Sequence, residues 1–156
     1  MKKLKVGVIG AGRIGKVHAA TLAQNVPQAE VLAIADVQLE NAQELADKFG
    51  IELVSSNYKD ILSNPLIEAV VICSPTDTHA QYIIEAAEAG KHIFCEKPVD
   101  LTLEAIKRAI AAVEKAGVKL MVGFNRRFDP NFLKIREMVQ TGKIGEPHIL
   151  KITSRD

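Results

Sequence analysis

The chain has 156 residues, of which 47% are hydrophobic and 25% are charged, and its formal net charge at pH 7 is +1. This length fits one domain, whose folding would bury about 70% of the surface that the unfolded chain exposes. A net charge this close to zero excludes a general affinity for nucleic acid or for acidic membranes.

The amino-terminal residues Met1 to Leu4 resemble the start of a signal peptide. The apolar run that follows is short, contains glycines and ends at Arg13 instead of a small-residue cleavage site. No stretch of the sequence approaches the length of a membrane span. We therefore expect a cytoplasmic protein without a membrane partner.

The first apolar segment runs into three glycines with the spacing G-x-G-x-x-G, namely Gly10, Gly12 and Gly15. Where a strand turns directly into a helix, Gly10 permits the tight turn, Gly12 lets the backbone approach a pyrophosphate, and Gly15 lets the helix pack on the strand. The unpaired amides of that helix make the turn an anion site. The motif is weak by itself, because glycine-rich turns also occur in folds that bind nothing.

A second apolar segment, Glu30–Ala35, ends in Asp36, which lies 21 residues after Gly15. Dinucleotide-binding folds carry at this place the acid that binds the adenosine ribose. A carboxylate accepts hydrogen bonds from the ribose diol and repels a 2′-phosphate, and the next residues, Val37 and Gln38, supply no guanidinium. We therefore expect NAD to be preferred over NADP. The alternative is that Asp36 is only a turn residue at a strand end.

Apolar segments and helical patterns alternate along the rest of the chain. Strands are predicted at 5–9, 30–35, 51–54, 69–73, 92–95 and 119–124, and helices near 12–25, 39–50, 58–62, 77–90, 102–117 and 129–142. The first helix is expected to turn Ile14, Val17 and Leu22 toward the core. This alternation predicts an α/β fold, a doubly wound Rossmann sheet of order 3-2-1-4-5-6 between two helix layers.

The tail of the sequence has a different pattern. Residues 143–147 read as a linker-like turn, and 148–153 as a strand without a partner, which would be an unpaired edge. We divide the chain into a Rossmann domain, residues 1–142, and a segment, residues 143–156, that begins a further domain. The exposed strand leads us to expect a monomer or a weak homodimer.

The two cysteines, Cys73 and Cys95, each lie near the end of an apolar segment. Neither belongs to a C-x-x-C pattern, and neither has a histidine at ligand spacing. We expect buried, reduced thiols and no metal site, and the alternative is a metal or redox role.

Ligands of doubly wound sheets bind beyond the carboxyl ends of the strands, where the strand order reverses. The segments predicted at that edge are 10–14, Asp36, 74–77, 96–98 and 125–128. The candidate cofactor-binding residues are Gly10, Gly12, Arg13, Ile14, Gly15, Asp36, Ser74, Thr76, His79 and Glu96.

Lys97 directly follows a strand end and precedes Pro98, so its ammonium is expected to project toward a bound nicotinamide. There it can bond a substrate hydroxyl and transfer a proton. The alternative is a solvated lysine on a turn. The neighbouring Glu96 can bond the nicotinamide ribose or pair with Lys97.

Two further groups are candidates at the same edge. His79, in the first turn of its helix, can touch the cofactor or cap the helix. Asn125 and Arg127 are candidate substrate ligands, although adjacent arginines such as Arg126 and Arg127 are otherwise solvated or bound to backbone carbonyls.

Three motifs taken together resemble the Gfo/Idh/MocA oxidoreductase family: VIGAGRIG at 8–15, CEKP at 95–98 and GFNRRFD at 123–129. Within it, FCEKP at 94–98 and ITSRD at 152–156 are most similar to inositol 2-dehydrogenases. The resemblance covers the whole chain. It implies NAD-dependent oxidation of a sugar or cyclitol hydroxyl, with Lys97 as the catalytic lysine.

The resemblance also implies that an aspartate and a histidine of the catalytic group belong to a carboxyl-terminal α/β domain that this sequence lacks. Because hydride transfer requires a positioned substrate, we expect the chain to bind NAD without turning over a polyol. The rival interpretation is a non-catalytic nucleotide-binding module or an engineered Rossmann fragment.

Overall fold

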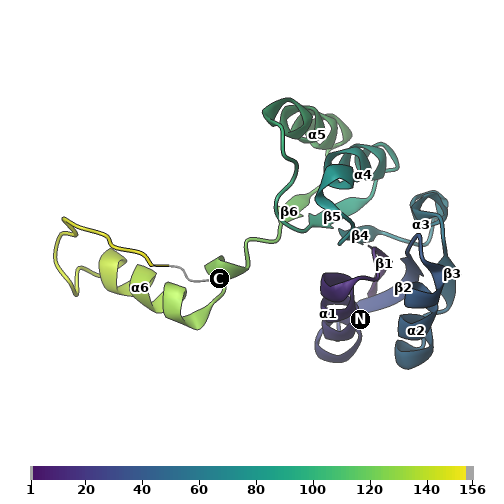
Figure 1. Cartoon of the computed structure of the whole chain (residues 1–156), viewed down its shortest axis with the longest axis horizontal. Helices are drawn as coiled ribbons and strands as arrows, with labels where there is room; N and C mark the ends of the chain where they lie inside the picture. The colour runs from purple at the N-terminus through teal and green to yellow at the C-terminus, as the bar shows by residue number, and fades with distance from the viewer. Residues whose placement is uncertain (1, 154–156) are drawn as a thin grey trace. The chain divides into compact units, whose positions relative to one another are not determined.

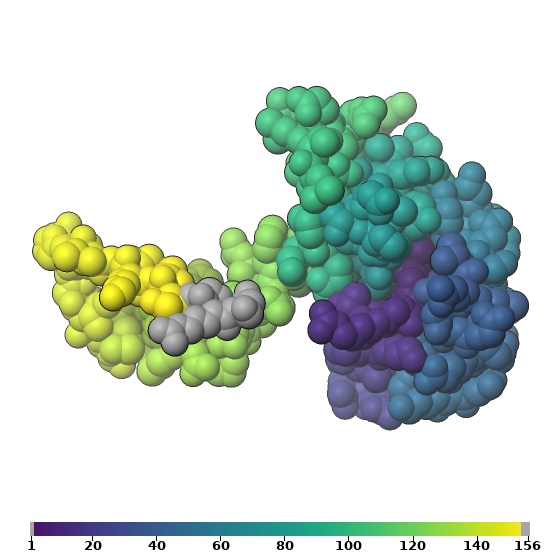
Figure 2. All heavy atoms as spheres, in the orientation of Figure 1, coloured from purple at the N-terminus to yellow at the C-terminus, as the bar shows by residue number. Residues whose placement is uncertain are grey.

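The computed structural model describes residues 2–153. The chain divides into two compact units, Met1–Gly123 and Phe124–Asp156, and each is described by itself (Figure 1; heavy atoms in Figure 2). Residues 154–156, which belong to the resemblance at 152–156 and to the predicted end segment, lie outside the described residues. Among the described residues, no helix is long and apolar enough to cross a membrane.

The first unit contains one parallel sheet. Its strands are β1 (Leu4–Ile9), β2 (Ala29–Ala35), β3 (Leu53–Ser55), β4 (Ala69–Ile72), β5 (His92–Cys95) and β6 (Leu120–Val122). Their order is β3-β2-β1-β4-β5-β6, and neighbouring strands pair in parallel. The predicted order and fold class are therefore confirmed.

Helices cover both faces of this sheet (Figure 1). They are α1 (Arg13–Asn25), α2 (Leu39–Phe49), α3 (Tyr58–Ser63), α4 (Thr76–Glu88) and α5 (Leu103–Ala116). One buried cluster joins the sheet to α3, α4 and α5, and a second joins it to α1 and α2. Central strand residues such as Val8, Ile34 and Val70 are fully buried, as expected for parallel strands that are covered on both sides.

The buried side of α1 agrees with the prediction in part, because Leu22 packs against the buried cluster but Ile14 and Val17 do not. Ile14 and Val17 are 39% and 54% exposed, whereas Gly15 and Ala19 are buried. The cause is the closeness of the helix to the first strand turn, because a Cβ at Gly15 would overlap the carbonyl oxygen of Gly10. Only residues with little or no side chain fit between helix and sheet at this first turn, so Ile14 and Val17 lie on other sides of α1.

The helices end in different ways. Thr102 caps α5 by accepting a hydrogen bond from the Ala105 amide. The C-cap of α2 is Gly50 at φ +69°. The N-cap of α4 is Pro75, and no side chain caps that helix.

The second unit contains the 3-10 turn η1 (Asn125–Arg127) and helix α6 (Pro130–Gln140). Asp129 caps α6 by accepting hydrogen bonds from the amides of Asn131 and Phe132. The strand predicted at 148–153 is not formed, so that prediction is wrong for this structure. An extended segment becomes a strand only when a neighbour pairs with its backbone groups, and no described residue pairs with 148–153.

Candidate active site at the carboxyl ends of the strands

A cavity of about 420 Å³ lies where β1, β2 and β4 end. We call it the crevice. Four of the predicted cofactor-binding residues line it, namely Gly10, Gly12, Asp36 and Ser74. The other lining residues are Ile9, Ala35, Val37, Gln38, Asn41, Ser56, Tyr58, Cys73, Pro75, Thr78 and Tyr82.

A side chain would have a different effect at each of the three glycines of the motif. Gly10 has φ +99°, and a Cβ there would lie 2.7 Å from the carbonyl oxygen of Cys73. Gly15 has no room for a side chain, because a Cβ there would overlap the carbonyl oxygen of Gly10. Gly12, by contrast, has φ −69°, and a Cβ there would meet nothing within 4 Å. The protein's own packing therefore requires Gly10 and Gly15, whereas a side chain at Gly12 would enter open space at the crevice.

The start of α1 is suited to an anion. Gly12 is its N-cap, no side chain caps the helix, and its first turn carries no acidic residue. The first amides of a helix have no intrahelical partner, and the helix dipole adds positive potential at that end. A diphosphate above Gly12 would satisfy these amides.

Asp36 holds the glycine turn as well as lining the crevice. Its Oδ2 accepts a hydrogen bond from the Ala11 amide at 2.6 Å, and its Oδ1 accepts one from the Gln38 amide at 2.8 Å. The carboxylate is half-buried, and each oxygen keeps a further lone pair. Asp36 can therefore stabilise its own turn and still accept hydrogen bonds from a ribose diol.

Three predicted cofactor-binding residues lie beside the crevice without lining it. Arg13 and Ile14 are exposed in the first turn of α1, and Thr76 is half-buried at the start of α4. The backbone amides of that first turn, more than the Arg13 and Ile14 side chains, are what the crevice offers to a ligand.

Hydroxyl groups order the loop between β4 and α4. The Thr78 hydroxyl donates its single proton to the Pro75 carbonyl oxygen at 2.7 Å. The Ser74 hydroxyl, 2.7 Å from the Thr78 oxygen, must therefore be the donor in that pair. This chain of bonds fixes the loop that forms one wall of the crevice.

His79 is 2% exposed and does not line the crevice. Its Nδ1 lies 2.7 Å from the Pro98 carbonyl oxygen, and its Nε2 lies 2.8 Å from the Ser74 carbonyl oxygen. A carbonyl oxygen only accepts, so each contact is a hydrogen bond when the ring nitrogen concerned carries the proton. These contacts join the Ser74 loop to the loop that carries Lys97.

Glu96 is bound by the protein itself. Its Oε1 lies 2.7 Å from His18 Nε2, and its Oε2 accepts a hydrogen bond from the Lys97 backbone amide at 3.2 Å. His18, which the sequence reasoning missed, also meets the Phe94 ring edge-on at a centroid distance of 5.1 Å. The sequence signal that could have identified His18 is its position three residues after Gly15, which places it near the side of α1 that faces the sheet.

The Lys97 side chain is exposed, and no hydrogen bond or ion pair to a described residue holds its ammonium. Its backbone is held through Glu96, as described above. This arrangement is compatible with a solvated lysine and with a lysine that meets a substrate.

The predicted substrate ligands Asn125 and Arg127 belong to η1 in the second unit. Within that unit, Arg126 lies over the Phe132 ring at 5.1 Å from its centroid. A cavity of about 520 Å³ there is lined by Arg126, Arg127, Phe132, Leu133 and Arg136.

Cys73 and Cys95 are buried free thiols, which confirms the prediction. Burial, together with the nearby Glu96 carboxylate, raises the pKa of each to about 12, so both stay protonated at neutral pH. Among residues 2–153, no group of histidine, cysteine and acidic side chains is arranged to hold a metal ion.

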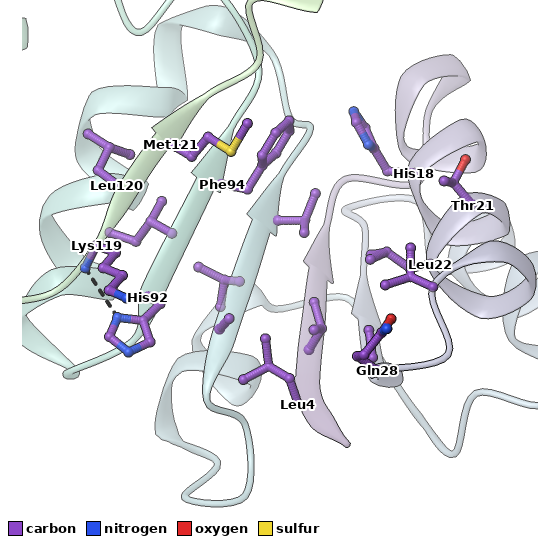
Figure 3. Close-up of a pocket in the computed structure, with 17 residues that line it drawn as sticks. Leu4, His18, Thr21, Leu22, Gln28, His92, Phe94, Lys119, Leu120 and Met121 are labelled. Atoms are coloured by element: carbon purple, nitrogen blue, oxygen red, sulfur yellow. Dashed lines mark hydrogen bonds between the residues drawn. The ribbon is translucent and has the colours of Figure 1, made fainter. Parts of the chain in front are cut away.

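A larger cavity, of about 770 Å³, lies on the face of the sheet beside α1 (Figure 3). We call it the apolar groove. Leu4, Phe94 and Met121 reach it from the strands, and Leu22 and His18 reach it from α1 (Figure 3). Its lining is mainly apolar, and it includes no residue of the glycine turn. The groove therefore offers no glycine turn at a helix start that could hold a diphosphate, and the smaller crevice is the candidate site.

Known proteins share this sequence and fold. Residues 4–124 match the family described as "Oxidoreductase family, NAD-binding Rossmann fold". The chain is 54% identical over 155 residues to the oxidoreductase YrbE of Bacillus subtilis and 45% identical over 153 residues to a myo-inositol 2-dehydrogenase of Thermotoga maritima. These matches cover 99% and 98% of this chain but only 45% and 46% of the relatives.

Solved structures agree with the sequence comparison. A scyllo-inositol dehydrogenase of Lactobacillus casei with bound NAD(H) and scyllo-inositol superposes with a TM-score of 0.88 at 36% identity, over 92% of this chain and 43% of that one. A probable dehydrogenase of Thermotoga maritima gives a TM-score of 0.89 at 44% identity, over 93% and 43%. The chain thus spans less than half the length of these relatives, and it belongs to the Gfo/Idh/MocA oxidoreductase family.

Proposed function

We propose that this chain is the NAD-binding part of a dehydrogenase that oxidises a hydroxyl of a cyclitol or sugar, similar to inositol 2-dehydrogenases. The observation that carries the proposal is the open space above Gly12, at an uncapped helix start and beside the Asp36 carboxylate. The names of the relatives, which include myo-inositol and scyllo-inositol dehydrogenases, support the substrate class.

The residues present fit a dinucleotide. The first amides of α1 would hold its diphosphate, and Asp36 would accept hydrogen bonds from the adenosine ribose. NAD, when bound, supplies the acceptor for the hydride of the alcohol. Lys97, exposed after β5, would bond the substrate hydroxyl and carry its proton. Its loop would be held in place by Glu96 with His18 and by His79.

The preference for NAD over NADP is part of the proposal. A 2′-phosphate beside the Asp36 carboxylate would meet a like charge, and such a phosphate needs a cation nearby. The lining of the crevice contains no lysine or arginine side chain. The backbone amide of Gln38, two residues after Asp36, already donates a hydrogen bond to the Asp36 carboxylate.

We further propose that residues 1–142 act as the cofactor domain and that residues 143–156 lead into a substrate domain. Because the relatives are more than twice as long as the matched part, the remaining catalytic groups would come from the part of their length that this chain does not cover. The chain alone would then bind NAD without turnover, as a cytoplasmic monomer or weak homodimer.

Calorimetric titration with NAD and with NADP, together with an assay for myo-inositol oxidation, tests the proposal. We expect NAD to bind more tightly than NADP, with no turnover by this chain. Failure of NAD to bind would overturn the proposed function. Tighter binding of NADP would overturn the role given to Asp36, and measurable turnover would show that this part is sufficient for the reaction. A longer form that binds NAD and oxidises no polyol would favour the non-catalytic module instead.

A further inference from the structure

Two tyrosines line the crevice at positions that the strand-end segments do not include. Tyr58 is the first residue of α3, and Tyr82 lies in the second turn of α4. Their rings are stacked, with centroids 3.9 Å apart and planes inclined by 29°. They are the only tyrosines of the sequence, which contains no tryptophan. The crevice therefore has an aromatic wall made from two helices.

The pair is held in place by the protein. The Tyr58 hydroxyl donates to Glu85 Oε2 at 2.8 Å, and the Gln81 side chain donates to Glu85 Oε1 at 2.8 Å. Both rings also pack against the buried cluster of α3, α4 and α5. Burial, reinforced by the Glu85 carboxylate, raises the pKa of Tyr58 to about 12, so it remains a donor at neutral pH. The wall is thus ordered before any ligand arrives, which reduces the entropic cost of binding.

The order of the strands places this wall on one side of the crevice. The glycine turn follows β1, Asp36 follows β2, and Tyr58 follows β3, so these groups lie progressively farther toward the β3 edge of the sheet. Tyr82 comes from α4, which follows β4, and its ring reaches this side by stacking on Tyr58. Lys97 follows β5, in the opposite direction from β1. A dinucleotide with its diphosphate above Gly12 and one ribose at Asp36 therefore extends its base toward the tyrosines.

The loop after β2 and the start of α2 also line the crevice. Val37 is 86% exposed there, and the Asn41 side chain donates to the Gln38 side chain at 2.9 Å. Both segments line the crevice together with the tyrosines. A planar base between an aromatic wall and an exposed valine would bury apolar surface on both of its faces.

Building on the proposed function, we propose that the Tyr58–Tyr82 pair is the adenine-binding wall of the crevice, against which the base packs opposite Val37. The interaction is aromatic and apolar, and its strength is independent of Lys97 and of the nicotinamide end. The pair is therefore a determinant of affinity for the adenosine half of the ligand, and the tyrosine emission of the whole chain reports on that half.

Tyrosine fluorescence lifetime tests this on the unmodified chain, because a lifetime is not distorted by absorption from the ligand. We expect ADP and NAD to shorten the lifetime in a saturable way, and nicotinamide mononucleotide at the same concentration to leave it unchanged. A lifetime that responds to nicotinamide mononucleotide and not to ADP would overturn the inference.

Two variants at one position make the test quantitative. Tyr82→Leu keeps an apolar side chain and removes the ring. We expect it to lower the affinity for ADP and the affinity for NAD by the same factor, about 10-fold. Tyr82→Phe should retain wild-type affinity, because the base packs on the ring and needs no hydroxyl. Thermal unfolding followed by circular dichroism checks that both variants are folded.

The outcomes separate this inference from the proposed function. If calorimetry detects no NAD binding by the unmodified chain, the proposed function itself fails. If NAD binds, and binding depends on Asp36, while the lifetime is constant and Tyr82→Leu changes affinity less than about 2-fold, the aromatic wall alone is wrong. If Tyr82→Leu does not fold, the lifetime of the unmodified chain still decides.

Discussion

The two cavities of the first unit differ in size and in chemistry. The crevice, about 420 Å³, lies at strand ends and brings together backbone amides, a carboxylate and hydroxyls. The apolar groove, about 770 Å³, lies on the sheet face and offers mainly aliphatic and aromatic side chains. Volume therefore does not mark the candidate site here. What marks it is the convergence of polar groups at an uncapped helix start.

The apolar groove has a structural cause. Strands of a parallel sheet are apolar on both faces. On one face, α4 and α5 cover β4, β5 and β6, whereas the other face has only α1 and α2, which join the buried cluster beside β1 and β2. Phe94 and Met121 are consequently left at the groove. Substitutions that change one cavity and not the other can test whether only the crevice binds the cofactor.

The largest effect is expected from Gly15→Val, because its side chain would overlap the Gly10 carbonyl and push α1 away from the turn. We expect a loss of about 3 kcal/mol or more in the free energy of unfolding. Urea denaturation followed by circular dichroism measures it. Wild-type stability would show that α1 does not lie this close to β1.

Gly12→Ala is the matched substitution within the same motif. A Cβ there meets nothing within 4 Å and φ is negative, so stability should stay within about 1 kcal/mol of wild type. Affinity for NAD should nevertheless fall by at least about 10-fold, because the methyl group occupies the approach to the diphosphate. Calorimetry measures the affinity. Unchanged NAD affinity would mean that the ligand does not use the space above Gly12.

Asp36→Asn tests the ribose end of the crevice with little change in shape. We expect NAD affinity to fall by about 10-fold and the preference over NADP to narrow, because the amide accepts more weakly and repels no phosphate. Parallel titrations with NAD and NADP measure both quantities. An asparagine has a single acceptor oxygen, so one of the two bonds from the Ala11 and Gln38 backbone amides is also lost, and the urea midpoint should be recorded as the control.

Lys91 lines neither cavity and separates stability from binding. Its buried ammonium donates to the carbonyl oxygens of Asn64 and Ile67, both at 2.8 Å. Lys91→Met should therefore cost about 1 kcal/mol of stability and leave NAD affinity unchanged. A loss of affinity in a variant that is fully folded would show that Lys91 is coupled to the crevice.

Lys91 should also make the stability of the protein depend on pH. Burial lowers the pKa of Lys91 below its ordinary 10.5. Between the lowered value and 10.5 the unfolded chain binds more protons than the folded one, so this group makes stability rise as pH rises through that window. Urea denaturation of wild type and Lys91→Met at several alkaline pH values isolates the contribution. A difference between the two proteins that shrinks with rising pH would contradict the sign.

The smallest effect is expected in the apolar groove. Met121→Gln places a polar side chain at a half-exposed groove position and should change NAD affinity less than about 2-fold. Calorimetry against wild type measures it. A larger change would show that the two cavities are coupled, and the route would be His18, which lines the groove and binds Glu96 beside Lys97.

Sequence alone determined the parts of this protein that follow from local pattern. Neighbouring residues and regular spacing determine the strands and the turn at Gly10. They also determine that Asp36 lies at the end of β2. The order of the sheet followed because right-handed crossovers leave few arrangements. These features could be predicted before any coordinates existed.

Tertiary structure alone decided the contacts between distant residues. His18 meets Glu96 across 78 positions, and Tyr58 stacks on Tyr82 across two helices. His79 lies between two loop carbonyls, and the closeness of α1 to the sheet leaves Ile14 exposed. Periodicity indicates which side of an element is buried, but the partner of a buried polar group depends on how the elements pack, and packing is settled only when the whole chain is folded.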